Sequence, residues 1–128
     1  MRLLLDTHVA LWAIADSPEL PTKARQLILD TGNEIYTSAA SVWEISIKHS
    51  LGRGNMPISG EQARQYFQKA GYHSVPITAE HAAQVESLPA HHADPFDRIL
   101  LAQAIHEPLH LLTHDSLLGR YDAPLMII

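Results

Sequence analysis

Short apolar runs alternate along this chain with longer segments of helical periodicity. The short runs predict strands at 3–5, 35–37, 74–77, 109–113 and 125–128. The intervening segments predict helices at 9–15, 22–29, 38–51, 61–70, 79–88 and 95–106, with a short helical turn at 115–118. Because strands and helices alternate, we expect a three-layer α/β/α sandwich around a central, mostly parallel sheet.

Several segments carry a more specific pattern. Segment 95–106 is apolar nearly all round, which indicates a buried helix. Pro76 favours an edge position for the strand at 74–77. Thr22 is predicted to cap the helix through Leu29, Ser38 is predicted to begin the next one, and glycines and a proline predict a loop at 52–57. In the helix after Ser38, helical spacing predicts a buried stripe formed by Ala40, Trp43, Ile47 and Leu51.

Composition narrows the class of protein. The chain has 128 residues, of which 46% are hydrophobic and 18% charged, so we interpret 1–128 as a single folded domain. The absence of cysteine excludes disulfides, thiolate zinc sites and a cysteine nucleophile. No apolar run approaches the ~20 residues of a membrane span, so we expect a cytoplasmic protein without membrane contact. The net charge of −5 argues against a basic nucleic-acid-binding protein.

Four acidic residues form the most informative chemical pattern. Asp6 and Asp115 each follow a predicted strand, and the carboxyl ends of parallel strands share one edge of the sheet. Asp97 lies in the first turn of the buried helix, so its approach to this edge depends on the preceding loop. Glu44 lies next to the predicted stripe of the third helix. The pattern therefore predicts a cluster of carboxylates.

Each acid also has an ordinary structural interpretation. Asp6 and Asp115 suit helix caps, and Asp94-Pro95-Phe96-Asp97 reads as a helix start with Asp94 as its cap. Glu44 and Lys48 are spaced as a solvated helix pair. However, carboxylates near a core are costly unless paired, and lysine occurs only at 23, 48 and 69. A hard divalent cation bound through oxygen would supply the missing charge.

Four stretches of the sequence carry a resemblance to a known family. They are Leu3-Leu4-Leu5-Asp6-Thr7-His8, Ser38-Ala39-Ala40-Ser41-Val42-Trp43-Glu44-Ile45, Asp94-Pro95-Phe96-Asp97-Arg98 and Leu112-Thr113-His114-Asp115. Together, in this order, they resemble the PIN-domain family, and within it the VapC-like ribonuclease toxins of bacterial toxin–antitoxin pairs. The resemblance spans nearly the whole chain and implies a parallel α/β sandwich.

The resemblance implies roles for individual residues. Asp6, Glu44, Asp97 and Asp115 stand at the positions of the family's four acids, and would be the catalytic metal ligands. Hydroxyl groups that support these acids would be those of Thr7, Ser38 and Thr113, for which ordinary caps and turns are an equal alternative. RNA phosphates would be contacted by Lys48, Arg53 and Arg98, for which surface solubility is the alternative.

The implied activity is hydrolysis of RNA phosphodiester bonds with one or two Mg²⁺ or Mn²⁺ ions, without a covalent enzyme intermediate. Bound cations would also offset the acidic net charge and let RNA approach. A homodimer and a cognate antitoxin protein are the implied partners. Two alternatives remain at this point: a PIN-fold nuclease outside a toxin–antitoxin pair, and a non-catalytic module of the same fold that binds nucleic acid or a partner.

Three other classes of site fit the sequence less well. A phosphoryl receiver needs a lysine near a late strand, and none follows Lys69. A phosphatase of the haloacid dehalogenase type needs a second aspartate two residues after Asp6, where this chain has His8. The pair His91-His92 suggests zinc, but a histidine pair in a loop is more often incidental.

Overall fold

The computed structural model describes residues 1–53 and 55–128. Its centre is a sheet of strands β1 (Arg2–Leu5), β2 (Glu34–Ser38), β3 (His73–Val75), β4 (His110–Thr113) and β5 (Leu125–Ile127). The strand order is β3-β2-β1-β4-β5, and every neighbouring pair is parallel. The predicted parallel sheet is confirmed, and β3 lies at an edge, as its proline suggested.

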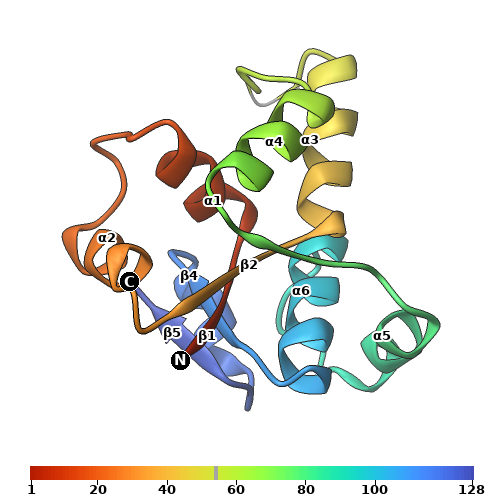
Figure 1. The fold of residues 1–128 in the computed structure, drawn as a ribbon. Helices are drawn as coiled ribbons and strands as arrows, with labels where there is room; N and C mark the ends of the chain where they lie inside the picture. Colours follow the sequence, from red (N-terminus) through yellow and green to blue (C-terminus); the bar gives the residue numbers. More distant parts are fainter. Residues whose placement is uncertain (54) are drawn as a thin grey trace.

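Helices cover both faces of this sheet (Figure 1). On one side lie α1 (Thr7–Ile14), α2 (Thr22–Leu29) and α4 (Gly60–Lys69). On the other side lie α5 (Ala79–Gln84), the 3₁₀ turn η1 (Val85–Ser87) and α6 (Pro95–His106). The remaining helices are α3 (Ala39–Ser50), which follows β2, and the 3₁₀ turn η2 (Ser116–Arg120), which follows β4. The three-layer sandwich is therefore confirmed.

The leucine run of β1 contributes to the two hydrophobic cores that lie on opposite faces of the sheet. Leu3 and Leu5 pack in the core that includes α1, α2 and α4, whereas Leu4 packs in the core that includes α6. All three are fully buried. Successive side chains of a strand point to opposite faces, so a strand covered on both faces reads as a continuous apolar run. This central strand ends directly before Asp6.

Helix α6 forms most of the second layer. It begins after Asp94, whose side chain accepts hydrogen bonds from the backbone N–H groups of Phe96 and Asp97. Residues 99–104 are all buried, which confirms the predicted buried helix. Because α6 leads into β4, which is parallel to β1, the helix starts at the carboxyl edge of the sheet. Asp97, in its first turn, lies at that edge.

Two expectations about helices were wrong. In α3 the buried residues are Ala40, Ser41, Glu44 and Ile45, while Trp43 is 56% and Leu51 58% exposed. Of the predicted stripe, Ala40 is buried and Ile47 half-buried, whereas Trp43 and Leu51 lie on the outer side of α3, which packs against α4 and α6. The cap of α2 is Pro21, without a side-chain hydrogen bond, so Thr22 is the first helical residue.

The predicted loop at 52–57 begins at Gly52, which has a φ of 65°. Gly54, also predicted for this loop, lies outside the described residues. The segment predicted as one helix at 79–88 is divided between α5 and η1. In the part of the chain that the structure describes, no helix combines the length and apolar character needed to cross a bilayer.

Candidate active site

Asp6 lies at the carboxyl end of β1 and is 6% exposed. Its Oδ1 accepts a hydrogen bond from Val9 N–H at 2.9 Å, so the residue does cap α1. Its Oδ2 accepts from the Thr113 hydroxyl at 2.5 Å. Burial raises the pKa of this carboxyl above its ordinary value, although both hydrogen bonds oppose the shift. Capping alone therefore does not account for Asp6.

Glu44 is supplied by the second turn of α3 and is 4% exposed. Its Oε1 accepts a hydrogen bond from the Thr7 hydroxyl at 2.7 Å, and its Oε2 accepts one from Lys48 Nζ at 2.5 Å. The expected pairing with Lys48 is present, but the acid is buried rather than solvated. Because Lys48 is paired with the buried Glu44, little positive charge is left to neutralise the other acids of the group.

Asp97 also has a strongly perturbed carboxyl. The pKa of Asp97 is raised to about 7, first by burial and then by the negative charge of Asp94. His92 opposes this rise, whereas the charges of Asp6 and Glu44 add to it. Like charges raise a carboxyl pKa in this way only when they lie close together. The acids predicted from separate segments are therefore electrostatic neighbours.

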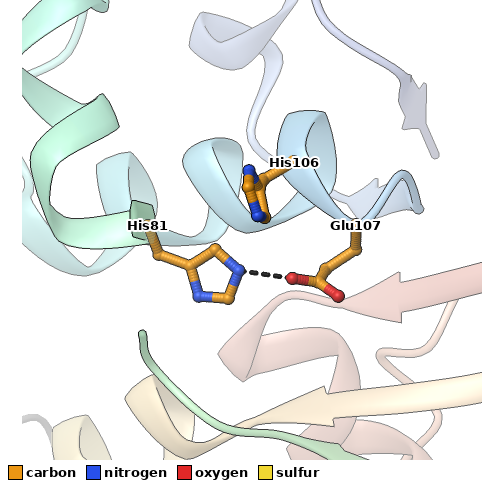
Figure 2. A group of neighbouring side chains, drawn as sticks. All are labelled: His81, His106 and Glu107. Carbon is orange, nitrogen blue, oxygen red and sulfur yellow. Dashed lines mark hydrogen bonds and ion pairs between the residues drawn. The ribbon is translucent and has the colours of Figure 1, made fainter. Parts of the chain in front are cut away.

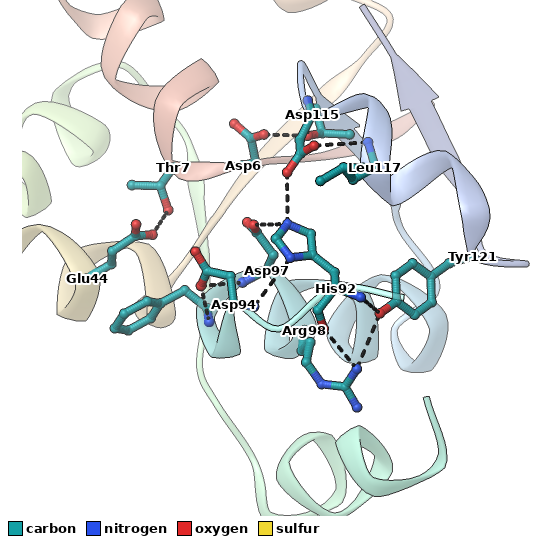
Figure 3. Close-up of polar contacts among 12 residues, drawn as sticks. Asp6, Thr7, Glu44, His92, Asp94, Asp97, Arg98, Asp115, Leu117 and Tyr121 are labelled. Atoms are coloured by element: carbon teal, nitrogen blue, oxygen red, sulfur yellow. Dashed lines mark hydrogen bonds and ion pairs between the residues drawn. The ribbon is translucent and has the colours of Figure 1, made fainter. Parts of the chain in front are cut away.

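Asp115 completes the group from the loop after β4 (Figure 3). Its Oδ1 accepts from Leu117 N–H at 3.0 Å, which caps η2. Its Oδ2 lies 2.9 Å from Nε2 of His92, and the same nitrogen lies 3.0 Å from Oδ2 of Asp97. One imidazole thus connects two of the four acids.

All four acids line a single cavity of about 210 Å³. The cavity lies at the carboxyl edge of the sheet, and its walls are formed by Asp6, Thr7, His8, Glu44, Lys48, His92, Asp94, Asp97 and Asp115. Among these lining residues, five are acids and only Lys48 carries a permanent positive charge. A concave site with such a donor set fits a hard divalent cation such as Mg²⁺ or Mn²⁺.

The family comparison agrees with the fold and the cavity. The family model for the PIN domain matches residues 3–124. The chain belongs to the PIN-domain family. No curated protein sequence matches it.

Solved structures share the fold of this PIN domain at low sequence identity. VapBC2 from Rickettsia felis, bound to a DNA fragment from its promoter, has a chain 17% identical, with a TM-score of 0.71, covering 99% of this chain and 98% of that one. FitAcB from Neisseria gonorrhoeae gives 21% identity, a TM-score of 0.61, and coverage of 97% and 96%. VapBC-1 from nontypeable Haemophilus influenzae is 15% identical, with a TM-score of 0.62, and the match covers 99% of this chain and 98% of that one. At these identities the likeness establishes the fold.

The three predicted hydroxyl groups of this PIN domain have different surroundings. Thr7 donates to Glu44, and Thr113 donates to Asp6, so both orient an acid of the cavity. Ser38 caps α3 at Ala40 N–H and donates to Gln103 Oε1 at 2.6 Å. Its hydrogen bonds therefore join α3 to α6 rather than reaching the acids.

Arg98 was expected to contact RNA, but its guanidinium is engaged within the protein. Its NH1 and NH2 groups donate to the backbone carbonyls of Val85, Leu88, Pro89 and His92 at 3.0 to 3.3 Å. NH1 also donates to the Tyr121 hydroxyl at 3.2 Å. With these partners Arg98 fastens the loop between η1 and α6. Lys48 lies in the cavity wall, and Arg53 is exposed.

His92 lines the cavity although the sequence assigned it no role in the acidic site. The histidine pair is not incidental: His92 contacts Asp97 and Asp115, whereas His91 packs edge-on against Tyr121 at 5.1 Å. Its position two residues before the Asp94 cap was the only signal in the sequence. That signal gives no direction for the imidazole, which depends on how the loop folds.

A second group of metal-ligand types is formed by His81, His106 and Glu107 (Figure 2). His81 Nδ1 accepts from Thr78 N–H at 3.1 Å, which places the ring proton of a neutral imidazole on Nε2. Nε2 lies 2.5 Å from Glu107 Oε2 and donates to it. Both ring nitrogens are thereby used, and the fully buried His81 joins α5 to the end of α6. This group is structural.

Proposed function

We propose that this PIN domain is a metal-dependent endoribonuclease of the cytoplasm. The observation that carries the proposal is the convergence of Asp6, Glu44, Asp97 and Asp115 on one cavity, from four separate segments of the chain. In this proposal residues 1–128 act as one nuclease domain and the four carboxylates hold Mg²⁺, with Mn²⁺ as the substitute.

The remaining residues of the cavity would control the geometry of these acids. Thr7 and Thr113 each donate a hydroxyl proton to a carboxylate oxygen, which fixes the direction of Glu44 and Asp6. Lys48 neutralises one oxygen of Glu44 and leaves the rest of the cavity acidic. Asp94 holds the first turn of α6 in place, and therefore holds Asp97.

The cation would supply positive charge for the phosphate and make a water molecule more acidic. The chain itself provides no cysteine nucleophile, and in this proposal its acids hold cations and orient water. A loaded cavity attracts a polyanion locally even though the net charge of the protein is −5. The acidic composition is thus compatible with an RNA substrate.

The test of this proposal is RNA cleavage by Asp6→Asn. The amide keeps the shape and the Asp6 cap position but removes the charge, so we expect cleavage to fall at least about 100-fold while the fold is retained. Cleavage is measured on labelled total RNA with Mg²⁺, with Mn²⁺ and with EDTA, and circular dichroism checks folding. The exposed Asp122→Asn is the matched control. Cleavage by Asp6→Asn at the wild-type rate would reject the proposal, and cleavage of DNA alone would correct the substrate.

We further propose that the nuclease is the toxin of a toxin–antitoxin pair and forms a homodimer. The likeness in fold to VapBC2, VapBC-1 and a toxin–antitoxin complex from Klebsiella pneumoniae supports this role. An apolar cavity of about 300 Å³ beside α1, of a kind that can receive a partner helix, also supports it; it is lined by Leu11, Ile14, Ala15, Pro57, Ile58 and Tyr66.

Induced expression tests the biological role. Growth arrest that requires Asp6 and is relieved by the product of a short adjacent reading frame would support the toxin assignment. Cleavage without such a gene would favour a PIN nuclease outside a toxin–antitoxin pair. Light scattering of the purified protein tests the homodimer.

A further inference from the structure

His92 occupies an unusual place between the acids of the cavity. Its side chain is 15% exposed and its Nε2 approaches two carboxylates, Asp115 at 2.9 Å and Asp97 at 3.0 Å. Figure 3 shows the imidazole directed from the loop before α6 into the space between them. The two acids come from different elements, so one side chain ties the start of α6 to the loop after β4.

The other ring nitrogen indicates how His92 is protonated. Nδ1 accepts a hydrogen bond from Asp94 N–H at 3.3 Å. An accepting Nδ1 leaves the proton of a neutral imidazole on Nε2. His92 therefore presents an N–H group, and not a lone pair, to Asp97 and Asp115. A donor in this place reduces the repulsion between the two carboxylates.

The cavity of about 210 Å³ is present with this imidazole in its wall. The ring thus leaves room for a cation beside the acids. We propose that His92 is a positioning residue for the metal centre: it donates Nε2–H to Asp115, holds the same N–H 3.0 Å from Asp97 Oδ2, and directs the remaining oxygen lone pairs of both acids into the cavity. This inference rests on the proposed cation site. Hydrogen-bond donors behind ligating carboxylates change metal affinity by about 10–100-fold.

The loop that carries His92 is itself fixed by a hydroxyl group. The Tyr121 hydroxyl accepts from His92 N–H at 2.9 Å and from Arg98 NH1 at 3.2 Å. Arg98 also donates to the His92 carbonyl at 3.3 Å. These bonds hold the backbone on both sides of the imidazole. Tyr121→Phe therefore weakens metal binding in the same direction as loss of His92, by a smaller factor.

Mn²⁺ titration calorimetry of the full chain tests the proposal. We expect His92→Ala to weaken Mn²⁺ binding by about 10–100-fold with the fold retained. His92→Gln, whose amide N–H has a reach similar to that of Nε2, restores most of the affinity, whereas the shorter His92→Asn does not. His110→Ala is the histidine control, because His110 is exposed at the opposite end of β4.

Each other outcome has a defined meaning. Tighter Mn²⁺ binding by His92→Ala would mean that the imidazole obstructs the cation site, and unchanged binding would mean that it has no effect on the site. Either result overturns the proposal. A much larger loss for Ni²⁺ than for Mn²⁺, without rescue by Gln, would make His92 a direct ligand and also overturns it. If the wild-type protein binds no Mn²⁺, the proposed nuclease function itself fails. If the wild-type protein binds Mn²⁺ and the binding requires Asp6 but not His92, only the inference about His92 fails.

Discussion

At the scale of residues, the site depends on carboxylates that the fold keeps close together and partly out of water. For Asp97 this arrangement is costly, since burial and the neighbouring acids raise its pKa to about 7. A carboxyl that titrates higher in the folded chain than in the unfolded chain makes folding depend on pH. The ordinary value of 3.8 and the folded value of about 7 set the range of this dependence.

We predict that the metal-free protein loses stability as pH rises from about 4 to about 7, because folding then opposes the ionisation of Asp97. At pH 4 Asp97→Asn has little effect, since the native acid is already neutral. At pH 8 the variant is more stable by roughly 1–3 kcal/mol, allowing for partial solvent screening.

Urea unfolding in EDTA at pH 4 and pH 8 measures this difference. Asp122→Asn serves as the exposed control. If Asp97→Asn were less stable than the wild type at pH 8, the crowding of like charges would not be the dominant effect at this position.

At the scale of elements, α3, which carries Glu44, meets α4 in a close contact that a side chain would prevent. A Cβ at Gly60 would lie 1.7 Å from Ser46 Oγ, 2.9 Å from Ser46 Cβ and 3.1 Å from the Val42 carbonyl oxygen. Gly60 begins α4, and Ser46 and Val42 belong to α3. The missing side chain at Gly60 therefore sets how closely the two helices approach.

We predict that Gly60→Ala destabilises the protein by about 1–3 kcal/mol, because α4 must move away from α3. Gly119→Ala is the matched control, since a Cβ there would meet nothing within 4 Å. Chemical denaturation of both variants measures the effect. Equal stabilities for the two variants would show that the Ser46 side chain gives way without cost.

At the scale of the whole molecule, the parallel sheet brings the distant acids together. Asp6 and Asp115 follow the paired strands β1 and β4, and α6 starts at the same edge. The acids repel one another in the folded chain, so a cation that binds only this arrangement stabilises it by mass action.

We predict that Mg²⁺ raises the melting temperature and that Asp6→Asn blunts the rise. At about 100 times the dissociation constant, binding adds about 2.7 kcal/mol, which corresponds to roughly 10 °C for a chain of this size. Thermal unfolding with Mg²⁺ and with NaCl of equal ionic strength measures the effect. The same increase in both proteins would assign it to non-specific binding.

The order of the elements, the parallel sheet and the candidate acids could all be predicted from the amino-acid sequence. Apolar runs and helical periodicity are local, and parallel strands must end at a common edge, so the positions of Asp6 and Asp115 follow from the pattern alone. The burial of α6 was also predictable from a local pattern, because apolar residues occupy nearly every face of this helix.

Contacts between side chains of different elements could not be predicted in this way, because they depend on the folded arrangement. The outward face of α3, the engagement of Arg98 by backbone carbonyls, the link from Ser38 to Gln103 and the place of His92 all depend on neighbours distant in the sequence. A stripe of apolar residues has the same spacing whether it faces a core or solvent. Likewise, the direction of a loop imidazole follows from the packing around the loop rather than from the residues next to it.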